Sequence, residues 1–280
     1  MNKKKLVNIL EYKHEQHPFH IVDTSPWPIL TSFALYNTAL GFIMYFHYFN
    51  NGVWYMLWGL IYVSLCLTGW FYDVIRESTF QGFHTRKVQQ NIYLGMLLFI
   101  LSEVMFFFSF FWAFFHFTLS PSIWIGGVWP PQGIVPIDPW ALPFINTALL
   151  LTSGIYITVT HRSIRTGNYK SVVKSLSWTI THGVIFSGIQ LHEYREATFS
   201  INDSVYGSIF YLMTGFHGIH VLVGTIFLIV CFFRHINYHF WRRHHVGLVC
   251  AIWYWHFVDI VWVLLYLCVY HWGGGKEGYK

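Results

Sequence analysis

Long apolar runs that are nearly free of charge restrict this chain to a membrane-spanning helical fold. Seven such runs occur, at residues 28–49, 54–75, 90–119, 140–160, 172–192, 204–233 and 247–270. Each is long enough for an α-helix to cross the hydrocarbon core of a bilayer, which takes roughly 18–20 residues. Only 10% of the residues are charged, whereas a soluble domain has about 25%. The pattern predicts an all-α membrane protein with seven transmembrane helices.

The distribution of Lys and Arg supports this number of helices. If there are seven spans, 14 of the 17 basic residues fall on one side of the membrane, in the N-terminal tail and in the loops after the second, fourth and sixth spans. The other side carries only Arg195, Lys276 and Lys280. Basic residues accumulate on the side of synthesis, so we expect the N-terminus there. Six or eight spans would break this alternation.

The spans divide the chain into five parts. These are an N-terminal segment on the basic side (1–27), the first two helices (28–75), a connecting loop (76–89), a bundle of helices three to seven (90–270) and a C-terminal tail (271–280). The N-terminus does not resemble a cleavable signal. The loop after the third span contains five prolines and no basic residue. We expect its Trp124, Trp129 and Trp140 to lie along the membrane interface.

Glu103 lies in the middle of the apolar run "LLFILSEVMFFFSFFWAFFHF" and has no basic residue within a helical turn. Ionisable side chains at membrane depth are costly, so each is a candidate functional group. Burial favours the neutral carboxyl unless another helix supplies a partner. A neutral carboxyl can donate a structural hydrogen bond or pass on a proton, and the spacing leaves both roles open.

Two histidine-containing patterns place polar groups on one helix face. His256 and Asp259 are three residues apart, so Asp259 could orient the imidazole, either as a structural pair or for proton handling. His217 and His220 have the same spacing, which is compatible with metal or haem ligation and with hydrogen bonding between helices. No phosphate-binding loop, nucleophile elbow or H-E-x-x-H helix occurs in the sequence. The chain therefore shows no self-sufficient active site.

Two further patterns favour packing over chemistry. Trp255 and Trp262 are seven residues apart and are expected to form a packing stripe. The four cysteines contain no Cys-x-x-Cys pair and are expected to be buried, reduced thiols.

Several longer segments resemble subunit III of cytochrome c oxidase, the haem–copper terminal oxidase, and follow the order of that family. They are "HPFHIVDTSPWP" (17–28), "DVIRESTFQGFHT" (73–85), "FILSEVMFF" (99–107), "WPPQGI" (129–134), "PFINTALLLTSG" (143–154), "FSINDSVYGSIFYLMTGFHGIHVLVGT" (199–225) and "HHVGLVCAIWYWHFVDIVWVLLY" (244–266). The first of them is closer to mitochondrial than to bacterial forms. The resemblance extends from end to end of the chain.

The resemblance implies a seven-helix fold in which helices one and two splay from the other five and leave a V-shaped cleft filled with phospholipid. It implies a non-catalytic core subunit with no metal or catalytic residue of its own. Haem and copper belong to partner subunits I and II, and accessory subunits complete the complex. The expected ligands are phospholipids such as cardiolipin. Nucleic acid is not an expected partner. The expected location is the mitochondrial inner membrane, crossed several times, with the N-terminus on the matrix side.

Individual residues take their expected roles from the matching motifs. Glu77 and His84 fall where the family contacts lipid head groups, and Arg234 and His239 fall where it meets a lipid phosphate. Glu103 matches a buried carboxyl of the third helix. The resemblance implies that the chain supports proton uptake, with Glu103 as a proton-linked group; His256 and Asp259 are proton-linked candidates from their spacing alone.

One position departs from the family motif. Val249 stands where the family usually has Glu, so the polar contacts near His244 and His245 are not carried over.

The nearest alternative to the cytochrome c oxidase interpretation is subunit III of a quinol oxidase. Two alternatives come from other classes: an independent proton-coupled transporter with Glu103, His256 and Asp259 as its relay, and a b-type membrane cytochrome.

Overall fold

The computed structural model describes residues 17–274, and every regular element in this part of the chain is helical. Its helices are α2 (Trp27–Phe46), α3 (Gly52–Arg76), α4 (Arg86–Leu119), α5 (Leu142–Thr166), α6 (Tyr169–Glu196), α7 (Ser204–Ile236) and α8 (Val246–Leu265). π-Helical turns continue α3 through Glu77–Gln81 and α8 through Tyr266–Trp272. Residues 1–16 and 275–280, which hold much of the expected N-terminal segment and tail, lie outside the described residues.

Within residues 17–274, these elements confirm the predicted all-α fold with seven helices. Six of them are long and apolar enough to cross a membrane by length and composition. The seventh, α6, has 28 residues but is more polar. The connection expected at 76–89 is shorter than predicted, because Glu77–Gln81 is helical and α4 already begins at Arg86.

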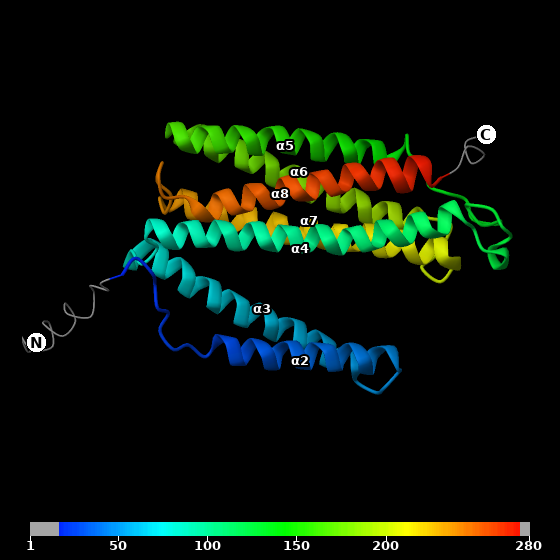
Figure 1. Cartoon of the computed structure of the whole chain (residues 1–280), viewed down its shortest axis with the longest axis horizontal. Coiled ribbons are helices and arrows are strands. Elements are labelled where there is room, and N and C mark those ends of the chain that lie inside the picture. The colour runs from blue at the N-terminus through cyan, green and yellow to red at the C-terminus, as the bar shows by residue number, and fades with distance from the viewer. Residues whose placement is uncertain (1–16, 275–280) are drawn as a thin grey trace, which may run out of the picture. The chain divides into compact units, whose positions relative to one another are not determined.

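The chain divides into two compact units, Met1–Ile92 and Tyr93–Lys280. In the first unit, α2 and α3 form an antiparallel hairpin (Figure 1). Glycines permit their close approach: a Cβ at Gly41 would collide with the Met56 backbone nitrogen, and one at Gly59 would lie 2.7 Å from the Thr38 Cα. Small residues have this function at many helix crossings in membranes.

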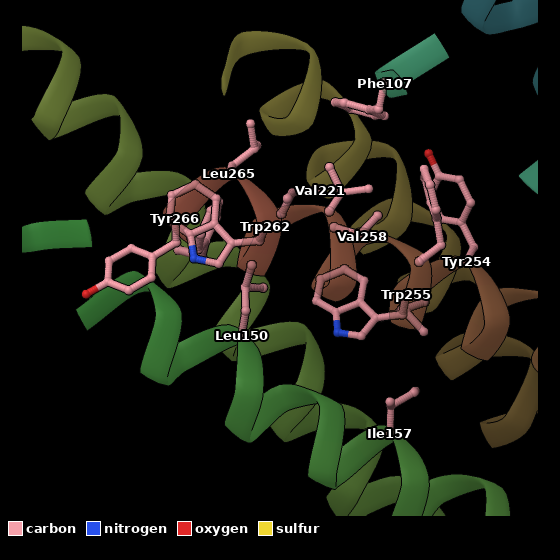
Figure 2. Packing of buried hydrophobic residues seen from close by; sticks show 14 of the residues in the cluster. Phe107, Leu150, Ile157, Val221, Tyr254, Trp255, Val258, Trp262, Leu265 and Tyr266 are labelled. Atoms are coloured by element: carbon pink, nitrogen blue, oxygen red, sulfur yellow. The ribbon is translucent and has the colours of Figure 1, made fainter. Parts of the chain in front are cut away.

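In the second unit, α4 to α8 run alongside one another (Figure 1), and α8 supplies much of the buried surface. Figure 2 shows Trp255 and Trp262 extending from α8 toward α5. Their indole N–H groups donate to the hydroxyl oxygens of Ser153 at 2.8 Å and Thr147 at 3.0 Å. Both indoles are fully buried. This confirms the predicted packing stripe and shows how each buried donor is satisfied.

The polar residues of α6 face hydroxyl groups of α5. Thr160 and Ser175 approach to 2.7 Å through their Oγ atoms, and Ser163 and Ser171 approach to 2.8 Å. Such pairs satisfy polar groups that lipid cannot hydrogen-bond. A helix of low hydropathy can therefore belong to a membrane bundle, because its polar side chains are covered by a neighbouring helix.

The long connection after α4 contains the three tryptophans expected at the membrane interface. Trp124 and Trp140 are 91% and 65% exposed. Trp129 instead packs into the unit against Tyr206, with a centroid distance of 5.3 Å, and its indole N–H donates to the Gly273 carbonyl at 3.1 Å. The four cysteines carry free thiols, three of them buried.

Candidate functional site

Glu103 on α4 contacts His220 on α7, with 2.8 Å between Oε2 and Nε2. The other ring nitrogen of His220, Nδ1, lies 2.6 Å from the Phe216 carbonyl oxygen. A carbonyl only accepts hydrogen bonds, so Nδ1 must carry a proton. The 2.8 Å contact then requires one proton between the two side chains, held either by the carboxyl or by Nε2. Both arrangements leave the pair with no net charge.

Aromatic rings surround this carboxyl–imidazole pair. The His220 ring lies 5.1 Å from the Phe107 ring and 6.1 Å from the Phe257 ring, measured between centroids. The Glu103 and His220 side chains are 22% and 11% exposed. An apolar environment strengthens a satisfied hydrogen bond and makes an unsatisfied one costly. The sequence identified Glu103 but did not indicate its partner.

His217 and His220 share one face of α7, as predicted, but they contact different helices. His217 is buried, and its Nε2 lies 3.3 Å from the carbonyl oxygen of Val258 on α8. Of the two alternatives, hydrogen bonding between helices describes both contacts. Among residues 17–274, no group of three or more His, Cys, Asp or Glu side chains is arranged to hold a metal ion.

His256 and Asp259 also share a helix face, but they are not hydrogen-bonded. Their Nδ1 and Oδ2 atoms are 3.9 Å apart, and His256 is 40% exposed. Asp259 lies close to α5 at Gly154, where a Cβ would be 2.8 Å from Oδ2. The spacing correctly predicted that the two side chains are close together. In the structure, the Asp259 carboxylate also lies against α5.

One buried carboxylate, Glu193, was not singled out from the sequence. Glu193, near the end of α6, is buried, and its Oε1 accepts hydrogen bonds from the Tyr270 hydroxyl at 2.6 Å and from Gln190 Nε2 at 3.1 Å. Gln190 Oε1 in turn accepts from Asn146 on α5 at 3.3 Å. These four residues link α5, α6 and the π-helical end of α8. Only the polar composition near the end of α6 could have pointed to them.

Arg234 and His239, the predicted phosphate contacts, lie together at the end of α7. The Arg234 guanidinium lies over the Phe240 ring at 4.5 Å, and the His239 backbone N–H donates to the Arg234 carbonyl at 3.0 Å. Burial lowers the pKa of His239, and the positive charge of Arg234 lowers it further. Val249, the position expected to depart from the family motif, is buried on α8.

Glu77 and His84, the other two predicted lipid contacts, lie in the first unit at the connection to α4. Glu77 Oε2 is 3.4 Å from His20 Nε2, and the His20 ring stacks on Phe83 at 4.6 Å. The His84 carbonyl accepts a hydrogen bond from the Gln89 side chain at 2.9 Å. The structure thus adds His20 as a partner that the sequence had not indicated.

The fold and these contacts define a class of protein: a polytopic helical membrane protein with a carboxyl–imidazole pair between its helices. The family model for cytochrome c oxidase subunit III matches residues 17–274. The chain belongs to this family.

Curated relatives agree over nearly the whole chain. The chain is 53% identical to "Cytochrome c oxidase subunit 3" of Prototheca wickerhamii over 92% of this chain and 99% of the relative. It is 50% identical to the protein of the same name from Aedes aegypti and 49% identical to that from Arabidopsis thaliana, each over 93% of this chain and 98% of the relative. These comparisons support the cytochrome c oxidase interpretation, and none of the three alternatives to it.

Proposed function

We propose that the chain is a non-catalytic core subunit of a mitochondrial cytochrome c oxidase, beside subunits I and II and accessory subunits. The family places it in an oxidoreductase complex. Haem and copper are held by the partner subunits, and this chain transfers no electron. The N-terminus faces the matrix, in accordance with the basic residues on that side.

The contact between Glu103 and His220 is the observation that carries the proposed role in proton uptake. The two groups are 2.8 Å apart, and a hydrogen bond between them holds one proton, which leaves the pair neutral whichever group carries it. A net charge would be costly in the membrane, so a neutral pair can stay there and still exchange its proton with water or a neighbouring group. The pair buffers or relays protons for the catalytic subunit. His256 and Asp259 are secondary candidates for the same role.

The second part of the proposal is that the chain holds structural phospholipid such as cardiolipin. Arg234 and His239 are basic groups at the basic end of α7, where an Arg suits a lipid phosphate. Glu77 and His84 contribute contacts to lipid head groups from the first unit.

Replacing Glu103 with Gln in the intact oxidase tests the proton-linked role. Gln is nearly isosteric, and its amide can donate to His220 Nε2, so we expect the complex to assemble with this subunit present. Proton uptake during turnover should be slower, because an amide cannot release a proton. Loss of the whole complex, or unchanged uptake by the assembled variant, would contradict the proposal.

Replacing Arg234 with Ala tests the lipid-holding role. We expect less bound phospholipid by native mass spectrometry and faster inactivation during turnover. Arg234→Lys is the matched control, because it keeps the positive charge and should keep most of the lipid. Unchanged lipid content in Arg234→Ala would argue against this role.

A further inference from the structure

A pocket of about 280 Å³ opens at the basic end of the second unit. It lies between the end of α5, the start of α6, the end of α7 and the segment that leads to α8. Asn168, Tyr169, His235, Tyr238, Trp241 and Arg242 contribute to its lining. We propose that this pocket binds an anionic phosphate group, carried by a phospholipid head group or by a soluble phosphate compound.

His235 is the first residue that indicates an anionic ligand in this pocket. It lines the pocket, is only 4% exposed, and stacks on the Tyr169 ring at 4.7 Å. The Tyr169 backbone is near the imidazole, but neither ring nitrogen has a hydrogen-bond partner of normal geometry. A buried polar group without a partner is costly. A phosphate oxygen that accepts from the ring N–H would remove this cost.

Arg242 supplies a permanent positive charge to the lining of the pocket. Its guanidinium lies against Gly167, at a place where a Cβ would collide with it, and Gly167 has a φ of 78°. The turn between α5 and α6 therefore needs glycine both for its backbone conformation and for the arginine. A guanidinium presents several N–H donors in one plane and suits the oxygens of a phosphate.

The N-terminus of α6 is the third contribution. α6 begins at Tyr169, and the Asn168 side chain caps it by accepting from the Ser171 N–H at 3.2 Å. The first N–H groups of a helix have no partner within the helix, and together with the helix dipole they favour an anion. Both Asn168 and Tyr169 line the pocket, so this end of α6 borders the same space as His235 and Arg242.

Charge and size fit a phosphate group. No Asp or Glu is among the residues that line the pocket, and Arg162, Arg165 and Lys170 lie in the same stretch of chain. Basic pockets between membrane helices on this side are typical sites for anionic head groups. The volume is near the lower limit of roughly 300 Å³ for small-molecule pockets, so it suits a head-group phosphate with the acyl chains outside.

The pocket is separate from the lipid contact proposed for Arg234. Successive residues of a helix are about 100° apart around its axis, so Arg234 and His235 leave α7 in different directions. Arg234 is not among the residues that line the pocket, whereas His235 is and stacks on Tyr169 of α6; the Phe240 ring borders the pocket and also lies against the Arg234 guanidinium. The inference therefore goes beyond the proposed function and does not depend on it.

Native mass spectrometry of the purified oxidase, stripped of loosely held lipid and titrated with short-chain phosphatidylglycerol, tests the proposal. Loss of a charge-assisted hydrogen bond should weaken one binding event by about ten- to a hundredfold in Arg242→Ala and in His235→Leu. Arg243→Ala is the matched control, because it removes the same charge from a neighbour that does not line the pocket. His235→Gln keeps an N–H donor and should retain binding.

Inorganic phosphate in a parallel titration identifies the source of the phosphate group. Competition with phosphatidylglycerol would show that soluble phosphate also enters the pocket, whereas binding of the lipid alone would assign the site to head groups. Unchanged binding in Arg242→Ala, or an equal loss in Arg243→Ala, would overturn the proposal. If Arg234→Ala loses lipid and Arg242→Ala does not, only the pocket is refuted, and the lipid-holding function stands. If His235→Leu fails to assemble, the comparison of Arg242→Ala with Arg243→Ala still tests the pocket.

Discussion

A double-mutant cycle on Glu103 and His220 tests whether their contact is an energetic link between α4 and α7. In Glu103→Leu the carboxyl is removed and His220 Nε2 loses its partner at 2.8 Å. In His220→Leu the carboxyl remains, surrounded by aromatic rings, without the imidazole. The double variant replaces both partners with apolar groups and leaves no polar group unsatisfied.

The expected magnitudes follow from this geometry. A buried donor or acceptor left without a partner costs about 1–3 kcal/mol, whereas hydrogen bonds between helices in membranes contribute about 0.6 kcal/mol on average and at most about 1.7. The pair is partly exposed, so each single Leu variant should lose about 1–2 kcal/mol. The double variant should lose less than the sum of the two, with a coupling of about 1 kcal/mol. Glu103→Gln should lose less than about 1 kcal/mol, because its amide still donates to Nε2.

The assay is the temperature at which the subunit dissociates or unfolds in the purified oxidase. A change of 1 kcal/mol corresponds to roughly 2–4 °C for a chain of about this size. Glu103→Leu combined with Ser153→Ala is the control, since Ser153 pairs with Trp255 on other helices and shares no partner with Glu103. Additive shifts in the Glu103/His220 cycle, within about 0.5 kcal/mol, would refute the energetic link.

Three further predictions concern the rest of the fold. Gly59→Leu should loosen the α2–α3 hairpin by about 1–3 kcal/mol, because a side chain would collide with the Thr38 backbone; faster limited proteolysis between the two helices would show it, and unchanged cleavage would exclude it. Ser153→Ala should cost about 1–3 kcal/mol by leaving the Trp255 indole N–H unpaired, seen as a lower dissociation temperature, and an unchanged temperature would contradict this. The pKa of His239 is lowered by burial and by Arg234, so the unfolded state binds the proton first and stability falls as pH decreases through the ordinary histidine range; thermal midpoints from roughly pH 8 to pH 5 should decline less in His239→Gln, and identical profiles would refute the effect.

Hydropathy and charge were sufficient to predict the seven helices, because both depend on residues close together in the chain. The helix ends were less predictable. α4 begins at Arg86 and not near residue 90, and α7 continues to Ile236 and not 233. Charged residues at helix ends such as Arg86 and Arg234 interrupt the apolar run but not the backbone hydrogen bonding, so hydropathy underestimates the length of a membrane helix.

Partners far apart in the chain could not be predicted from a single sequence. Glu103 and His220 are separated by 117 positions, and helical periodicity gives the face of each residue but not which faces meet. Glu193 and Tyr270 were missed for the same reason. The spacing of His256 and Asp259 predicted proximity correctly but not the hydrogen bond, because the carboxylate lies close to α5 as well as to its own helix.

The structure makes the two predicted proton-linked acids physically different. Glu103 Oε2 lies 2.8 Å from His220 Nε2, within hydrogen-bond distance, so a proton that moves between the two side chains leaves the net charge of the pair unchanged. Asp259 has its nearest imidazole at 3.9 Å, beyond hydrogen-bond distance, so a proton that leaves Asp259 would separate charge inside the membrane. Because the cost of that charge opposes proton release, we infer that proton exchange in this subunit depends mainly on Glu103 and His220, with Asp259 in a secondary role and in the packing of α8 against α5.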